Sequence, residues 1–189
     1  TCTDENLRDI RRREIRYVFQ EPQQALNPAV SIRTQMALAS DSDSNSEDAV
    51  HEALHSVGLE SPHEVMRLYP HQLSIGMAQR VMIAMAVLPH PSLLIADEPT
   101  SALDASLRFQ LLDLLKSLQL QNGMAMILVT HDLAIARKYA DDIAVMRDGV
   151  VLELSSSTAF FQEPSHPYSQ LLLRAANELT LQIEVGSHT

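Results

Sequence analysis

Two short apolar segments, each ending in residues that can carry chemistry, constrain the fold of this chain most. They are LLIADEP at 93–99 and MAMILVTHD at 124–132, and their lengths predict strands at 93–96 and 126–130. A helical pattern from about Ala105 to Gln121, with Gly123 behind it, separates the two. Alternation of strand and helix predicts a parallel sheet covered by helices. The chain is therefore expected to have an α/β fold.

The remaining sequence predicts a helical region before this sheet and a hairpin after it. Ser61, Pro62 and Glu64 suit the N-cap, N1 and N3 positions of a helix, which predicts a capping box. The other helices are predicted at 5–13, 31–39, 47–57, from Ser74 to Leu88, and at 133–139, with a polar linker at 41–48. Further strands are predicted at 15–19, at 143–146 and at 150–154, the last two forming a hairpin at the sheet edge.

Acidic and imidazole side chains follow the two buried strands directly. Asp97 and Glu98 come after the first strand, and His131 follows the second. Because open α/β sheets bind ligands at the carboxyl ends of their strands, these groups are expected in one layer. Asp97 suits a Mg²⁺ shell, Glu98 can orient or deprotonate water, and His131 can donate to a phosphate oxygen. The alternatives are a helix-capping acid pair and a capping or surface histidine.

Composition excludes several classes of protein. Cys2 is the only cysteine of 189 residues, so there is no intrachain disulfide and no all-cysteine metal cluster, and a reducing compartment is expected. The longest apolar run, from Val81 to Leu88, is far shorter than a membrane span. The formal charge is −10, and the basic cluster at 11–16 is interrupted by Glu14, so no nucleic-acid partner is expected.

Five motifs in a fixed order make the sequence similar to the ABC ATPase family over about residues 15–170. They are VFQEP with Gln20 as the Q-loop, LSIGMAQR at 73–80 as the signature motif, LLIADEP as Walker B, SALD at 101–104 as the D-loop, and VTHD with His131 as the switch histidine. The resemblance implies an ATPase that uses ATP and Mg²⁺.

The resemblance also implies a role for each motif residue. Gln20 and Asp97 would bind Mg²⁺, with Gln20 also relaying the nucleotide state, and Glu98 and His131 would be catalytic. Ser74 and Gly76, at the N-terminus of a helix, would hold the γ-phosphate bound by the opposite subunit of a dimer. Asp104, in the D-loop, would contribute to nucleotide binding.

For the whole chain, the resemblance implies a P-loop NTPase (RecA-like) core with an inserted all-helical subdomain, truncated at its N-terminus. The expected division is 1–20 for the end of the first part of the core, 21–80 for the helical subdomain, 81–154 for the second part of the core, and 155–189 for a C-terminal extension. The implied partners are a second ABC ATPase subunit, identical or different, two transmembrane permeases and, indirectly, an extracytoplasmic solute-binding protein. The protein would lie peripherally on the cytoplasmic face of the membrane.

Shorter segments are similar to the ATP-binding subunits of oligopeptide, dipeptide and nickel importers. These segments are NP at 27–28, YPHQLS at 69–74, the methionine of IGMAQR, and HPYSQLLL at 166–173. The sequence therefore predicts an importer subunit for peptides or a related small solute. The first alternative is a non-hydrolytic remnant that acts as a binding or regulatory partner. The second is a soluble ABC ATPase with no link to transport.

Two departures from the family pattern bear on activity. No G-x-x-x-x-G-K-[ST] segment occurs, because neither Lys116 nor Lys138 follows a glycine. Truncation upstream is the expected explanation, and the chain as given should bind ATP poorly. Ile75 stands where the family has the first signature glycine, and its branched side chain narrows the approach of a phosphate.

A further motif is interpreted as coincidental. HEALH at 51–55 matches the H-E-x-x-H pattern of zinc proteases. It lies in the expected helical subdomain, with no third ligand at a recognisable spacing, so a solvated amphipathic helix is predicted instead.

Overall fold

The computed structural model describes residue 10 and residues 14–40 and 46–186. It forms two compact units, Thr1–Val129 and Thr130–Thr189, which are described separately below. The helix predicted at 5–13 and most of the linker at 41–48 fall outside the described residues.

The first unit is built on a three-stranded parallel sheet. The strands are β1 (Ile15–Val18), β2 (Leu93–Asp97) and β3 (Ala125–Val129), in the order β1-β2-β3. Pairing runs from Ile15 opposite Leu93 to Val18 opposite Ala96, and from Leu93 opposite Ala125 to Asp97 opposite Val129. The predicted α/β class is confirmed, and the strand bounds differ from the prediction by only one residue.

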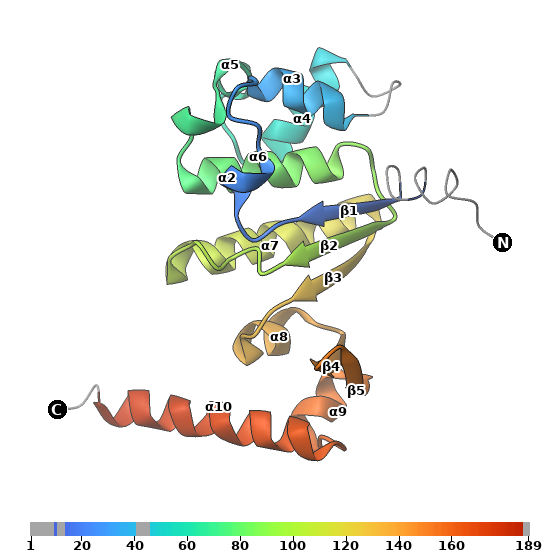
Figure 1. The fold of residues 1–189 in the computed structure, drawn as a ribbon, viewed down its shortest axis with the longest axis vertical. Helices are drawn as coiled ribbons and strands as arrows, with labels where there is room; N and C mark the ends of the chain where they lie inside the picture. The colour runs from blue at the N-terminus through green and yellow to red at the C-terminus, as the bar shows by residue number, and fades with distance from the viewer. Residues whose placement is uncertain (1–9, 11–13, 41–45, 187–189) are drawn as a thin grey trace. The chain divides into compact units, whose positions relative to one another are not determined.

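Helices occupy the two connections between these strands. The connection from β1 to β2 contains α2 (Pro22–Ala25), α3 (Ile32–Ala39), α4 (Glu47–Ser56), α5 (Pro62–Arg67), the 3-10 helix η1 (Pro70–Gln72) and α6 (Ile75–Val87). Figure 1 shows α3 to α6 gathered on the β1 side of the sheet. The connection from β2 to β3 is α7 (Ala105–Asn122). Neither α2 nor η1 was predicted, since both are shorter than two helical turns and lack a hydrophobic period.

Polar caps fix where several of these helices begin and end. The side chains of Ser46, Ser74 and Asp104 accept hydrogen bonds from amides of the first turn of α4, α6 and α7. Gly123 ends α7 with φ +63°, which a glycine adopts at little cost. The capping box predicted at Ser61 is wrong, because its side chain makes no cap bond. Instead its carbonyl accepts the Glu64 amide at 3.1 Å.

The core of the first unit lies between the sheet and the connecting helices. Helix α6 is buried on several sides, as its apolar sequence predicts. The largest fully buried side chains of this unit are Val18, Ile32, Met36, Leu54, Val57, Gln79, Ile83, Leu94, Leu112, Leu115 and Leu118. The sheet edge that carries Asp97 therefore rests on a packed scaffold.

The second unit contains an antiparallel hairpin and three helices. Its elements are α8 (Leu133–Tyr139), β4 (Asp142–Arg147), β5 (Val150–Ser156), α9 (Ser157–Gln162) and α10 (Pro167–Gly186). In the described residues β4 pairs only with β5, so the prediction of a hairpin at the edge of the parallel sheet is wrong. The inner face of this hairpin packs Ile143 and Val145 against Phe160 of α9. None of the helices described has both the length and the apolar composition of a membrane span.

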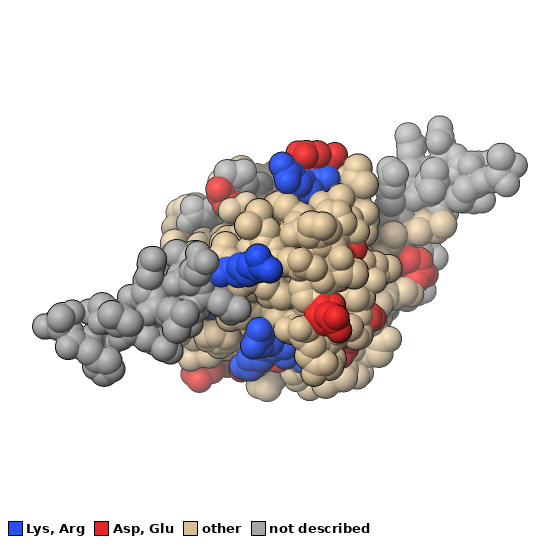
Figure 2. Space-filling model, turned by 90° about the horizontal axis from the view of Figure 1, so that it is seen from below, with Lys and Arg blue, Asp and Glu red and all other residues tan. Residues whose placement is uncertain are grey.

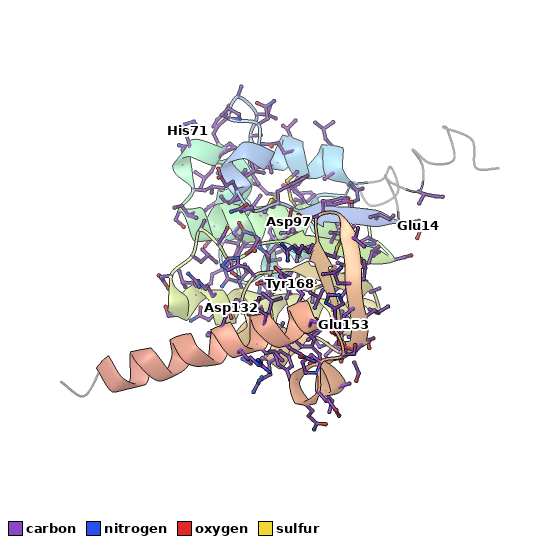
Figure 3. All side chains as sticks on the ribbon, turned by 60° about the horizontal axis from the view of Figure 1, so that its bottom comes forward. Glu14, His71, Asp97, Asp132, Glu153 and Tyr168 are labelled. Carbon is purple, nitrogen blue, oxygen red and sulfur yellow. The ribbon has the colours of Figure 1, made fainter. Side chains whose placement is uncertain are left out.

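Glu153 of β5 joins the hairpin to the start of α10 (Figure 3). It is only 6% exposed, and its carboxylate accepts the amides of Ser165 and His166, each at 3.0 Å. The neighbouring Ser169 hydroxyl, followed by these two amides, lowers the pKa of Glu153 to about 2. The start of the HPYSQLLL segment is thus held by a buried anion.

Replacing Glu153 by Gln is expected to reduce stability most at neutral pH. Glutamine has only one acceptor oxygen, so its NH2 group would face one of the two backbone amides, at a cost of about 1–3 kcal/mol. Because the folded pKa is lowered, the ionised carboxylate stabilises the wild type fully above its unfolded value of about 4.5. That contribution disappears as pH falls towards 2. The difference in free energy of unfolding between wild type and Glu153→Gln, measured by urea unfolding, should therefore be smaller at pH 4.5 than at pH 7 and smallest at pH 3. Asp148→Asn, at a side chain 88% exposed, is the control, and an equal loss there would contradict the assignment.

Candidate functional site

The predicted magnesium residues leave neighbouring parallel strands at one sheet edge. Val18 of β1 pairs with Ala96 of β2, so Gln20 and Glu98 each lie two residues beyond a paired position. Adjacent strands are about 4.8 Å apart, which places these strand ends side by side. Gln20 and Asp97 are exposed, and Glu98 is half-buried. Figure 3 shows Asp97 at the end of β2.

The backbone of Glu98 has an unusual conformation. Its φ is +45°, a region that non-glycine residues adopt at a cost of about 1–3 kcal/mol. Its amide donates to the Val129 carbonyl at 3.0 Å, and its own carbonyl accepts the Ser101 amide at 3.1 Å. These bonds tie the residue to the end of β3 and to the turn that follows, so the carboxylate leaves the strand in a fixed direction.

The donor set at this edge fits Mg²⁺. In the described part of the chain, no hydrogen bond or ion pair engages the Asp97 carboxylate. No cluster of three or more His, Cys, Asp or Glu residues suited to a metal is found among the described residues. Mg²⁺ needs no such cage, because it keeps several waters and binds through one or two protein oxygens plus substrate phosphates.

Ser74 lies at the N-terminus of the 13-residue helix α6. Its hydroxyl accepts the Met77 amide at 3.2 Å. At Gly76 an added Cβ would meet nothing within 4 Å, so the space beside the first helical turn is open. The Ile75 side chain is 47% exposed at the same end. The geometry supplies unpaired first-turn amides of the kind that attract anions, with one branched side chain beside them.

Asp104 has a structural role that the structure shows directly. Its carboxylate accepts the amides of Ser106 and Leu107 at 3.1 and 3.0 Å, and the Ser106 hydroxyl at 2.8 Å. The Leu107 amide, followed by the Ser106 hydroxyl, lowers the pKa of Asp104. Capping of α7 therefore accounts for this residue, and its predicted contact with nucleotide stays a prediction.

His131 belongs to the second unit and is exposed. It follows Val129, the last residue of β3, by two positions. The next residue, Asp132, caps α8 by accepting the amides of Ala134 and Ile135, and its own amide donates to the Thr130 hydroxyl at 3.1 Å. The predicted meeting of His131 with Asp97 and Glu98 in one pocket stays a prediction.

The HEALH segment forms part of α4. His51 contacts His63 of α5, with ring centroids 4.6 Å apart. His55 is exposed in the last turn of the helix. This arrangement is an aromatic contact between two packed helices, consistent with the predicted amphipathic helix.

The sequence analysis predicted no role for one polar residue near the site. Gln79 is a buried amide side chain in the apolar helix α6, and its Nε2 donates to the Pro99 carbonyl at 2.8 Å. A glutamine within an otherwise largely apolar helix is the sequence signal that could have identified it, since buried amides need partners.

Charge is scattered over the face drawn in Figure 2. Among the described residues visible there, lysine and arginine side chains form small separate groups, one of which lies beside acidic side chains. This view shows no continuous basic area of the kind that binds nucleic acid.

The known proteins that are similar to this chain include ATP-binding components of transporters. The family model described as "ABC transporter" matches residues 2–101. The dipeptide transport ATP-binding protein DppD of Escherichia coli (strain K12) is 44% identical over 170 residues, which cover 87% of this chain and 52% of that protein. The peptidoglycan transport ATP-binding protein YejF of Agrobacterium fabrum is 41% identical over 180 residues, covering 93% of this chain and 33% of that protein. The chain thus spans between a third and about half the length of these relatives.

Two solved structures share the fold. One is a dimeric ATP-binding cassette in a post-hydrolysis state with ADP and phosphate bound. It is 31% identical with a TM-score of 0.67, and the match covers 82% of this chain and 68% of that one. The other is cbiO1 of Clostridium perfringens, part of an ABC transporter complex, 27% identical with a TM-score of 0.73 over 94% of this chain and 71% of that one.

Proposed function

Because the chain belongs to the ABC transporter family, we propose that it is part of an ATP-binding and ATP-hydrolysing subunit of an importer. The proposed solute is a peptide or a related small molecule, in line with the names of the dipeptide and oligopeptide transport relatives. The proposed location is the cytoplasmic face of a membrane, where the subunit would be peripheral.

The observation that carries this proposal is the arrangement at the end of β2. Asp97 presents an exposed carboxylate directly beyond a buried strand, and Glu98 follows with a positive φ. A costly backbone conformation that surrounding hydrogen bonds hold in place is typical of functional sites. The pair suits phosphoryl transfer, in which a metal neutralises phosphate charge and a carboxylate orients water.

In the proposed reaction, each of four residues has one task. Gln20 and Asp97 would hold Mg²⁺, which supplies neutralisation of the β- and γ-phosphate oxygens of ATP. Glu98 would accept a hydrogen bond from the attacking water and polarise it. His131 would donate to a γ-phosphate oxygen, which stabilises the charge that develops there.

A second subunit completes the proposed site. Ser74 and the amide of Gly76, at the open N-terminus of α6, would hold the γ-phosphate bound to a partner ATPase, with Asp104 nearby in the proposed interface. The dimeric structural relative with bound ADP and phosphate supports nucleotide binding in a dimer of this fold. Two transmembrane permeases and an extracytoplasmic solute-binding protein are the other proposed partners.

Replacing Asp97 by Asn is the direct test of the proposed metal site. An amide loses the charge that Mg²⁺ prefers, so the Mg²⁺ concentration for half-maximal ATP turnover should rise by at least about 10-fold. Turnover is measured on the complete gene product, because these 189 residues contain no P-loop motif.

The matched control is Asp142→Asn, at an exposed aspartate of the hairpin, which should leave the Mg²⁺ requirement unchanged. A wild-type gene product that does not turn over ATP would overturn the proposed function and favour a non-hydrolytic binding role. An unchanged Mg²⁺ requirement in Asp97→Asn would remove that residue from the metal site.

A further inference from the structure

Gln79 makes a buried contact between the helix of Ser74 and the turn after Glu98. Its side chain is 1% exposed, and Nε2 donates to the Pro99 carbonyl at 2.8 Å across 20 residues of sequence. A buried amide donor without a partner costs about 1–3 kcal/mol, so both groups are strongly held to this geometry. Pro99 directly follows Glu98, so this bond holds the turn immediately after the proposed catalytic carboxylate, in addition to the bond from the Ser101 amide to the Glu98 carbonyl.

Glu98 needs such an anchor because its backbone is strained. On its N-terminal side the amide is held by the Val129 carbonyl at 3.0 Å. On its C-terminal side Pro99 has no amide hydrogen to donate, so its carbonyl is the group that can be fixed. The bond from Gln79 fixes that carbonyl. The positive φ of Glu98 is therefore held by a bond to β3, a bond from the Ser101 amide and, one residue further on, the bond from α6.

Arg80, the residue after Gln79, holds helix α6 in position. The Arg80 guanidinium donates to the Val57 carbonyl at the C-terminal end of α4. The same guanidinium lies against Gly58, where an added Cβ would come within 2.7 Å of it. Gln79 and Arg80 thus tie α6 to the turn after Glu98 and to α4, respectively. Ser74 lies five residues before Gln79 on this helix, about 7 Å along its axis.

We propose that Gln79 is a positioning residue that links the Ser74 anion site to the orientation of Glu98. This inference rests on the proposed function, since it assigns Glu98 to water activation and Ser74 to phosphate of the partner site. A displacement of α6 when phosphate binds at Ser74 would reach the Pro99 carbonyl through one hydrogen bond. Each subunit could then report occupancy of the partner's site to its own catalytic carboxylate.

Hydrogen exchange on the chain itself tests the link without any assay of activity. Gln79→Met keeps the side-chain length and removes the donor, so the amides of Glu98 and Ser101 should lose protection by at least about 10-fold. The matched control is Gln35→Met. Gln35 is another buried glutamine, whose Nε2 donates to the Asn27 and Val30 carbonyls at 3.0 and 2.8 Å. That variant should expose loop 27–30 and leave Glu98 and Ser101 protected.

Turnover by the complete gene product provides the functional readout. Gln79→Met should lower kcat by about 10-fold and leave the KM for ATP within about twofold, the pattern of a group that acts on the chemical step. Gln79→Asn keeps the amide on a shorter side chain, so its kcat should lie between those of the wild type and Gln79→Met. This variant replaces Gln79→Met in the test if the methionine variant does not fold. In a Glu98→Gln background, Gln79→Met should cause no further loss.

Two results would overturn the proposal. One is unchanged protection of Glu98 and Ser101 in Gln79→Met. The other is an equal fall in kcat for Gln79→Met and Gln35→Met, which would indicate a general loss of packing. If the wild-type gene product does not hydrolyse ATP, the proposed function fails, and the exchange result still decides whether Gln79 holds the turn after Glu98.

Discussion

ATP turnover is expected to fall by at least about 100-fold when Glu98 is replaced by Gln, while nucleotide binding remains. The amide has almost the same size as the carboxylate but cannot polarise the attacking water or take its proton. The backbone is unaffected, because the positive φ is held by main-chain bonds to Val129 and Ser101. The loss should therefore appear in kcat.

Turnover and binding of ATP have to be measured on the same preparation of the complete gene product. The control is Glu163→Gln, at an exposed glutamate that ends α9, and it should have wild-type turnover. Retained hydrolysis in Glu98→Gln would remove the residue from its proposed role. Loss of ATP binding as well would indicate that the side chain serves affinity instead of the chemical step.

Local sequence signals predicted much of the fold and most of the proposed site. The strands that deliver Asp97 and His131 are short apolar runs followed by polar residues, a pattern that needs no tertiary information. The position of Ser74 at the start of a helix was equally predictable, because capping depends on a side chain and amides two or three residues away. Such features are set by neighbours in the chain.

Contacts between distant segments were not predictable in this way. The bond from Gln79 to Pro99 and the bond from Arg80 to Val57 each join groups 20 or more residues apart. Both depend on how α6 is rotated against its neighbours, which the helical period alone does not specify. The hairpin of β4 and β5 was predicted correctly, but its place at the edge of the parallel sheet was not, since an apolar strand pattern does not indicate which sheet a hairpin joins.

The positive φ of Glu98 shows why the site itself was only partly predictable. Sequence identified the carboxylate and its place after a strand, but strain in a non-glycine residue has no signature in the chain. It exists because bonds from β3, the following turn and α6 over-determine the backbone there. The carboxylate and its position after the strand were therefore predictable from residue types, whereas its rigid presentation depends on packing.

Replacing Phe160 by Ala is expected to destabilise the second unit by about 3–5 kcal/mol. The ring is fully buried between Ile143 and Val145 of the hairpin and makes a T-shaped contact with Phe161 at 5.0 Å. Side chains of α8, including Leu133, pack against the same cluster. The large cavity left by alanine removes contacts on every side, and the loop that carries His131 leads directly into α8.

Hydrogen exchange locates this loss within the chain. Amides of Ile143 and Val145 should lose protection in Phe160→Ala, whereas amides of β2 in the first unit should keep theirs, because local stability follows the packing of each unit. Phe109→Ala, at a ring 42% exposed on α7, is the matched control and should cost less than about 1 kcal/mol. Equal losses of stability in the two variants, or an equal loss of amide protection in β2, would show that Phe160 does not organise the second unit.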